Sequence, residues 1–194
     1  MKIKKLNSNK NLRAYIIGLA IGDGNLSNPS GRATRLRITC DIKYPLLINR
    51  IKKSVQLLLP ENKTSIAIRK GNCLDISCYS NHLENLLGWK AKNGSKIKQS
   101  VGVPSWIKEN KEYSIQCLKG LIETDGSIYN DRGYKMVNFV TYIPTLADDV
   151  MNMIKLLNFK PNIQILKLSN NTKHTIRISK NTEKFIQVIG IDKS

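Results

Sequence analysis

The sequence predicts an α+β protein built from two tandem copies of one α-β-β-α-β-β-α unit. The first observation is an internal duplication at an offset of 102 positions, with seven identities in an ungapped window of 22 residues. Average composition would give about one or two by chance. The second is apolar spacing that switches between helical and strand periods in the same order in both copies. The third is a composition of 41% hydrophobic and 24% charged residues in 194, which suffices for a packed core. The recurring residues are Gly18, Leu19, Asp23, Gly24, Asn28, Gly31 and Thr39, matched by Gly120, Leu121, Asp125, Gly126, Asn130, Gly133 and Thr141.

Each copy begins with a predicted helix, over residues 12–22 and 112–124, because apolar residues recur there every three to four positions. An Asp-Gly pair follows each helix. We expect Gly24 and Gly126 to end the helices in the left-handed conformation that glycine tolerates.

A turn and a strand follow in each copy. The turns at 28–31 and 130–133 combine Asn, Gly and Pro or Asp, and predict β-hairpins. The first long strand alternates Arg35, Arg37 and Thr39 with Leu36, Ile38 and Cys40, a pattern typical of a sheet with one buried and one basic face. The remaining predicted elements are helix 44–59, strands 64–69 and 73–78 and helix 81–88, then strand 134–142, helix 145–158, strands 162–168 and 174–179 and helix 181–189.

The predicted organisation is an N-terminal half over 1–88, a connector over 89–111 and a C-terminal half over 112–194. The connector contains Gly94, Pro104 and six lysines (Lys90, Lys92, Lys96, Lys98, Lys108 and Lys111). This composition favours an exposed connector beside a polyanion over an element of the core, and a merely solvated basic linker is the alternative.

Charge indicates the class of partner. The chain carries 32 Lys and Arg against 14 Asp and Glu, a net charge of +18. Residues 1–102 have 19 basic and 5 acidic side chains (+14), and residues 103–194 have 13 and 9 (+4). Such an excess favours a nucleic-acid partner over an anionic membrane. No apolar run is long enough to span a membrane, and the first residues lack a secretory signal.

Four cysteines lack any C-x-x-C pair, and only two histidines accompany them. Zinc binding and a disulfide framework are therefore disfavoured, and reduced core cysteines are expected. We expect an intracellular, reducing location: the cytoplasm or nucleoid, or an organelle matrix if the gene lies in an organelle.

The two Asp-Gly motifs predict a close helix pair. Gly18 and Gly22 lie four residues apart on one helix face and are matched by Gly120 and Thr124, and small residues permit close backbone approach. If the helices pack side by side about a pseudo-twofold axis, the aspartates that end them come together.

Asp23 and Asp125 would then repel each other and oppose the helix dipoles. A divalent cation such as Mg²⁺ would relieve both effects. Alternatively, each aspartate merely precedes a glycine in a helix-ending turn. Their duplication favours the metal-ligand interpretation, as does Asp23 being the only acid among the first 40 residues.

Segments 16–24 and 118–126 resemble the two signature motifs of single-chain LAGLIDADG homing endonucleases. The resemblance implies motif helices at the interface of the halves and two antiparallel sheets that form a DNA-binding saddle. It also implies cleavage of both strands at a long, non-palindromic site in double-stranded DNA, usually for a mobile intron. A monomer without a protein partner or membrane is expected, since one chain supplies both halves.

The resemblance further implies a shared site with two or three divalent ions, normally Mg²⁺, with Mn²⁺ or Ca²⁺ able to substitute in binding. Asp23 and Asp125 are the predicted ligands and catalytic acids. Gly22 and Thr124, which precede them, complete the predicted metal site.

The resemblance also implies basic residues beside the metals, and the candidates for them are lysines. Members of the family often have a lysine ahead of the second motif, and Lys96 or Lys98 matches by position. Many members also have a glutamine after the first long strand, where this chain has Cys40 and, in the second copy, Tyr142. Lys43 is the candidate to substitute for it.

DNA contacts are predicted on the outward strand faces and the first turn, where arginine suits guanine and Asn or Gln suits adenine. An RNA maturase of the same fold and a non-catalytic DNA-binding protein are the alternatives. The predicted DNA-contacting residues are Arg32, Arg35, Arg37, Thr39, Ser65, Arg69, Asp75, Ser77, Lys135, Asn138, Gln164, Lys173, Thr175 and Arg177.

Overall fold

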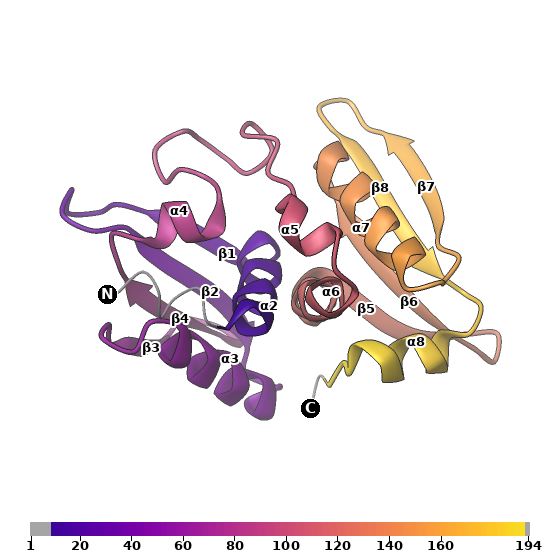
Figure 1. Ribbon diagram of the computed structural model, residues 1–194, viewed down its shortest axis with the longest axis horizontal. Helices are drawn as coiled ribbons and strands as arrows, with labels where there is room; N and C mark the ends of the chain where they lie inside the picture. The colour runs from indigo at the N-terminus through magenta and orange to yellow at the C-terminus, as the bar shows by residue number, and fades with distance from the viewer. Residues whose placement is uncertain (1–8, 193–194) are drawn as a thin grey trace.

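The computed structural model describes residues 9–192, and within them each half has the predicted order α-β-β-α-β-β-α (Figure 1). No helix in this range is both long and apolar enough to cross a membrane. The first half comprises α2 (Lys10–Ile21), β1 (Gly24–Ser27), β2 (Arg35–Asp41), α3 (Pro45–Leu58), β3 (Thr64–Ile68), β4 (Cys73–Tyr79) and α4 (Leu83–Leu87). After α5 (Ser105–Lys108), the second comprises α6 (Lys111–Asp125), β5 (Gly126–Asp131), β6 (Tyr134–Thr141), α7 (Pro144–Leu156), β7 (Asn162–Lys167), β8 (Thr172–Ile178) and α8 (Thr182–Ile189).

Each half forms one four-stranded antiparallel sheet, with strand orders β1-β2-β4-β3 and β5-β6-β8-β7. The predicted alternation along β2 is confirmed: Leu36 and Ile38 are buried, whereas Arg35 and Arg37 lie half-buried on the opposite face. Figure 1 shows α2 and α6 at the centre, with one sheet on either side.

The two copies differ by one residue in their first hairpins. Gly24 pairs with Ile38, but Gly126 pairs with Phe139 rather than with Val140, which the 102-residue offset would require. The second hairpin turns tightly through Arg132 and Gly133, both at positive φ. Consequently the structural counterpart of Cys40 is Thr141, and the alignment of Cys40 with Tyr142 is corrected by one position.

The expected left-handed helix ends at Gly24 and Gly126 are wrong. Gly126 has φ −92° and ψ 157°, and neither glycine is among the positive-φ residues. Both instead begin the strand that folds back against the preceding helix. A Cβ on Gly24 would lie 2.8 Å from the carbonyl carbon of Ala20, and one on Gly126 would lie 2.6 Å from the Ile122 oxygen. Glycine is therefore needed at both positions because a side chain would overlap the main chain of the preceding helix.

The prediction of an exposed connector is also wrong in part. Trp89, Val101, Val103 and Ile107 are buried in the core, while most of the lysines face outward. The buried residues lie at the two ends of the segment, whereas residues 90–100 between them are exposed or half-buried.

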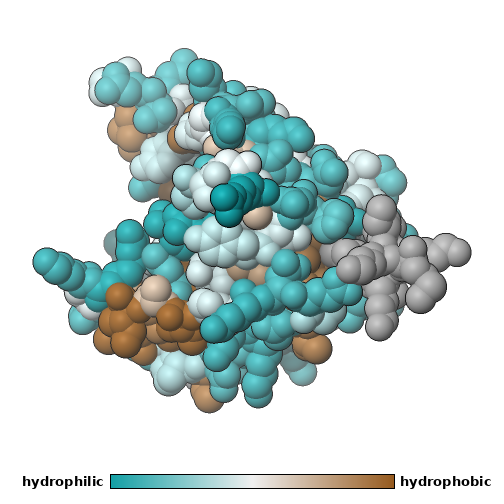
Figure 2. Space-filling model, turned by 90° about the vertical axis from the view of Figure 1, so that its left-hand side faces the viewer, coloured by the Kyte–Doolittle hydropathy of each residue, from teal (hydrophilic) through white to brown (hydrophobic). Residues whose placement is uncertain are grey.

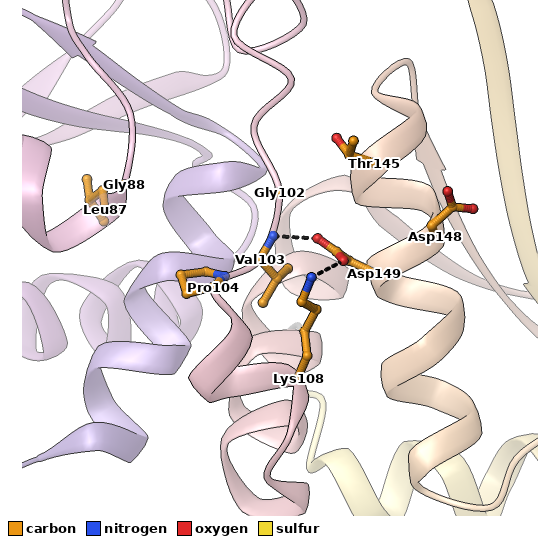
Figure 3. A pocket seen from close by; sticks show the side chains of 9 residues that line it. All are labelled: Leu87, Gly88, Gly102, Val103, Pro104, Lys108, Thr145, Asp148 and Asp149. Carbon is orange, nitrogen blue, oxygen red and sulfur yellow. Dashed lines mark hydrogen bonds and ion pairs between the residues drawn. The ribbon is translucent and has the colours of Figure 1, made fainter.

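Asp149 of α7 fixes the end of the connector. The main-chain N–H of Val103 donates to its Oδ2 at 2.7 Å, and the Lys108 ammonium lies 2.5 Å from its Oδ1 (Figure 3). A Cβ on the intervening Gly102 would lie 2.7 Å from the same Oδ2. The connector therefore packs against the second half as an ordered strap.

Glycines on both sides determine the contact between α2 and α6. A Cβ on Gly18 would overlap the carbonyl oxygen of Cys117 and lie 3.1 Å from the Leu121 nitrogen. A Cβ on Gly120 would overlap the Tyr15 carbonyl oxygen and lie 2.7 Å from the Leu19 nitrogen. The two helices thus touch backbone to backbone, as the paired motifs predicted.

We expect Gly18→Ala to destabilise the protein by about 2 kcal/mol, because the added methyl group meets rigid backbone. In an exposed helix the same change would stabilise by about 1 kcal/mol, so the sign of the effect tests the packing. Urea unfolding is the measurement. Gly71→Ala is the control: its Cβ meets no atom within 4 Å, and its positive φ alone should cost about 1 kcal/mol. A Gly18→Ala variant as stable as the wild type would contradict the packing.

Candidate active site and nucleic-acid interface

The two motif aspartates lie at the ends of the paired helices. Asp125 is the last residue of α6 and Asp23 lies two residues beyond α2; both are exposed, while Gly22 is buried between the helices. A Cβ on Gly22 would lie 2.8 Å from the Thr124 Cβ and 3.3 Å from Asp125 Oδ2. The carboxylate of one motif therefore lies against the end of the other.

The ends of the two motif helices, from Gly22 to Asp23 and from Thr124 to Asp125, form what we call the junction. Lys96 brings a positive charge to this junction from the connector. Its ammonium donates to the carbonyl oxygens of Ala20, Ile21 and Gly22, the last carbonyls of the α2 end. Burial lowers the pKa of Lys96, and the nearby carboxylates of Asp125 and Asp23 oppose that shift. Lys96 is thus within electrostatic reach of both acids.

The other two predicted lysines are placed elsewhere. Lys98 is exposed and lies over Gly94. Lys43 is exposed beyond β2, where its ammonium pairs with Asp41 at 3.0 Å and lies 4.9 Å from the Tyr44 ring centre. The hydrogen bond to Asp41 raises the pKa of Lys43. Of the three candidates, Lys96 is the one with contacts at the junction.

Cys40 lies beside the junction on the buried side of β2. Burial raises the pKa of its thiol to about 12, and the carboxylates of Asp23 and Asp75 add to the shift. The thiol is therefore neutral at physiological pH and provides neither a charge nor a strong hydrogen bond. Tyr142, beyond β6, is exposed, and its buried neighbour Thr141 occupies the position equivalent to Cys40.

The residues present offer hard oxygen donors to a cation. Within residues 9–192 no group of three or more His, Cys, Asp or Glu side chains could hold a metal ion. Two carboxylates and main-chain carbonyls therefore form the donor set, which suits Mg²⁺ because this ion keeps several waters. The carbonyl oxygens around the Lys96 ammonium show that the end of α2 already holds a cation. The Thr124 hydroxyl lies within hydrogen-bond distance of the Gly120 and Leu121 carbonyls of its own helix, at 2.9 and 3.0 Å.

Most predicted DNA-contacting residues share the outward faces of the two sheets. In the first sheet, Arg37 and Ser65 both pair with Ser77 across the strands. In the second, Asn138 pairs with Arg177 and Gln164 with Thr175. The remaining ones on these faces or the adjoining turns are Arg32, Arg35, Thr39, Arg69 and Lys173. Figure 2 shows that this face of the molecule is mostly hydrophilic, with one large hydrophobic patch and a few smaller ones.

Two predicted contacts require correction. Lys135 lies on the helix-facing side of β6, in the same alternation as Val137 and Phe139, and its ammonium pairs with Glu183 of α8 at 2.7 Å. Asp75 is on the outward side but only 7% exposed, and two arginines cover it. Neither side chain is presented to a base.

The sequence analysis missed residues of the short first strands. Ser27 accepts a hydrogen bond from Arg35 at 3.2 Å, and the Tyr129 hydroxyl accepts one from Asn138 at 2.8 Å. Ser27 lies directly opposite Arg35, and Tyr129 lies diagonally opposite Asn138, in hairpins whose turns had been recognised. Counting outward from each turn would have placed them on the same face.

A buried polar network also joins the halves near the junction. The Tyr15 hydroxyl donates to Glu123 Oε2 at 2.6 Å, and Arg50 of α3 donates to Oε1 at 3.0 Å. Arg50 also pairs with Asp192 at 3.3 Å. Burial raises the pKa of Glu123, and the Tyr15 hydrogen bond and the Arg50 charge oppose the rise. Glu123 was not predicted as a site residue, although it is a carboxylate within an apolar motif helix.

Comparison with known proteins confirms the resemblance drawn from the motifs. The LAGLIDADG-like domain family matches residues 112–190, so this half is a LAGLIDADG-like domain. Among curated proteins, none matches by sequence. The homing endonuclease I-DmoI, in a study of mesophilic variants, superposes with a TM-score of 0.69 at 21% identity over 93% of this chain and 95% of its own. I-DmoI in complex with DNA and Mn gives the same score and identity over 93% and 96%.

A second kind of protein shares the fold. The N-terminal LAGLIDADG domain of DUF199/WhiA superposes with a TM-score of 0.62 at 15% identity, over 99% of this chain and 92% of that domain. At these identities the likenesses establish the fold of the whole chain. The predicted pair of pseudo-twofold repeats with the motif helices at their interface is thereby confirmed.

We expect Arg50→Ala to cost about 3 kcal/mol of unfolding free energy at pH 8, because Glu123 then remains charged without its main partner. The loss should be smaller at pH 5. Removing Arg50 raises the pKa of Glu123 further, and the neutral form, present below that pKa, is cheaper to bury. Urea unfolding at both pH values is the measurement. The control is Lys52→Ala, an exposed change on the same helix; an equal loss at both pH values would contradict the proposed cause.

Proposed function

We propose that this chain is a site-specific homing endonuclease that acts as a monomer. It binds a long, non-palindromic site in double-stranded DNA and, with divalent metal, hydrolyses one phosphodiester bond in each strand. The observation that carries the proposal is the junction of the motif helices, where Asp125 lies against Gly22, the neighbour of Asp23, and the Lys96 ammonium binds the last carbonyls of α2 within electrostatic reach of both acids. The solved I-DmoI complexes, which contain DNA with Mn or Ca, support it by likeness of fold.

The geometry suggests a role for each group. Asp23 and Asp125, with the main-chain carbonyls of Gly22 and Thr124, would hold the metal, which when bound activates water and stabilises the leaving oxygen. The Lys96 ammonium would balance the charge of the phosphate. Because the two acids come from different halves, each is available to serve one strand.

The outward faces of the sheets supply the binding surface. Arginines, amides and hydroxyls dominate them, the donors and acceptors that match base edges in the major groove. The net charge of +18 favours tight, salt-sensitive attachment to phosphates. An RNA maturase would prefer RNA, and a non-catalytic DNA-binding protein would bind its site without cutting.

The first test is cleavage of duplex DNA that joins the sequences flanking the mobile element in its genome. We expect double-strand cutting with Mg²⁺ and none with EDTA. Asp23→Asn and Asp125→Asn should each reduce cutting at least about 100-fold while binding persists. The matched control is Asp148→Asn, an exposed acid on α7. Tight, specific binding without cutting in any divalent metal would refute the nuclease.

A second prediction concerns Lys96. We expect Lys96→Met to lower the cleavage rate about 100-fold, by loss of one preorganised positive charge, with little change in DNA affinity. Single-turnover cleavage and gel-shift titration separate the two quantities. Lys92→Met removes an exposed charge from the same connector and should cut at the wild-type rate. Equal loss in both variants would assign Lys96 to general charge attraction alone.

A further inference from the structure

The arginines of the two outward sheet faces share one arrangement: each turns its Nε toward a side chain on its own sheet. The acceptors are a hydroxyl, a carboxylate and an amide from neighbouring strands. The Nε of Arg35 donates to Ser27 and that of Arg177 to Asn138, each at 3.2 Å, whereas the Nε atoms of Arg69 and Arg37 face Asp75 in ion pairs at 3.3 and 3.8 Å, the latter without a hydrogen bond. Within residues 9–192, the terminal Nη groups of these four arginines make no hydrogen bond to the protein.

Asp75 is the centre of this arrangement in the first sheet. Its Oδ2 faces both Arg37 and Arg69, and its Oδ1 accepts a hydrogen bond from the Thr39 hydroxyl at 2.8 Å. The side chain is 10% exposed, so its charge is balanced by the arginines rather than by water. A carboxylate facing DNA would repel phosphates, and these oxygens are already engaged. Asp75 is therefore placed to orient other groups and not to contact bases.

Because Nε is directed toward the sheet, the two Nη groups form the outward edge of the guanidinium. Two parallel donors of this kind match O6 and N7 of guanine in the major groove. A planar guanidinium fixed before binding also loses little further rotational freedom on the DNA.

We propose that Asp75 is a positioning residue for guanine specificity, holding Arg37 and Arg69 toward two neighbouring guanines in the half-site that faces the first sheet. This inference rests on the proposed DNA-binding function. It explains why Asp75, an acid on the DNA-facing side of a basic protein, is buried: from there its carboxylate orients the two arginines.

The arrangement also predicts an asymmetric target. Arg35 and Arg37 are two residues apart on β2, about 7 Å, which is close to two base-pair steps of about 3.4 Å. Arg37 and Arg69 meet at one carboxylate oxygen. The first half-site should thus contain a cluster of guanines within about four base pairs. The second sheet presents one such arginine, Arg177, among amides that suit adenine.

The test is selection of bound duplexes from a randomised DNA library in Ca²⁺, followed by sequencing, with the wild type and Asp75→Asn. For the wild type we expect guanines clustered in one half-site. For Asp75→Asn we expect the preference for guanine to fall about tenfold at two neighbouring positions. Affinity for random DNA should not fall, because the variant loses a negative charge. This split separates positioning from a general loss of binding.

Asp131→Asn makes the same charge change at the tip of the second hairpin and should keep the selected guanines. Thermal unfolding shows whether Asp75→Asn folds. If it does not, Arg69→Lys replaces it, keeping the charge but losing the paired donors, and should lose guanine preference at one position. Unchanged preference in the folded variant overturns this inference and leaves the endonuclease standing. A wild type that selects no DNA sequence overturns both.

Discussion

The close contact between α2 and α6 is the constraint on which the rest of the structure depends. Gly18 and Gly120 each lie where a side chain would overlap the main chain of the other helix. Gly22 at the end of α2 also lies against Thr124 near the end of α6, so the two helices end side by side, and each is followed by the first strand of its own sheet. The glycine contact therefore brings the ends of the two motif helices together, with one sheet on either side (Figure 1).

This geometry concentrates negative charge, which the chain must balance. Two helix C-termini and two carboxylates share one small region, and each opposes the others. Lys96 offsets part of this cost by donating to the last carbonyls of α2. The connector that carries Lys96 is anchored beyond it, where Val103 is buried and its N–H donates to Asp149. The packed connector thus places the Lys96 charge that partly balances the negative charge at the junction.

The sequence predicted what depends on periodicity and repetition: the elements, their order, the buried faces of the strands and the meeting of the helices. The sequence-based predictions were wrong for residues whose role depends on contacts with other segments of the fold. Gly24 and Gly126 resembled left-handed helix ends, but their role is to admit a strand folding back over the helix. Lys135 belongs to a strand shifted by one residue in the second hairpin, which moves its side chain to the opposite face. The burial of Asp75 depends in part on Arg37 of β2, a strand distant in sequence.

The two halves have kept the junction and diverged on the outward faces. Gly18 and Asp23 recur in the second copy, whereas register places Thr175 where the first sheet has Asp75. One sheet therefore orients its guanidinium groups with a buried carboxylate, and the other with the amide of Asn138. The pseudo-symmetric helix pair places one aspartate in each half at equivalent positions. Because one chain encodes the two sheets separately, their outward side chains can differ. A duplicated chain can therefore contact two unlike half-sites around one pseudo-symmetric centre, which a homodimer of identical sheets cannot do.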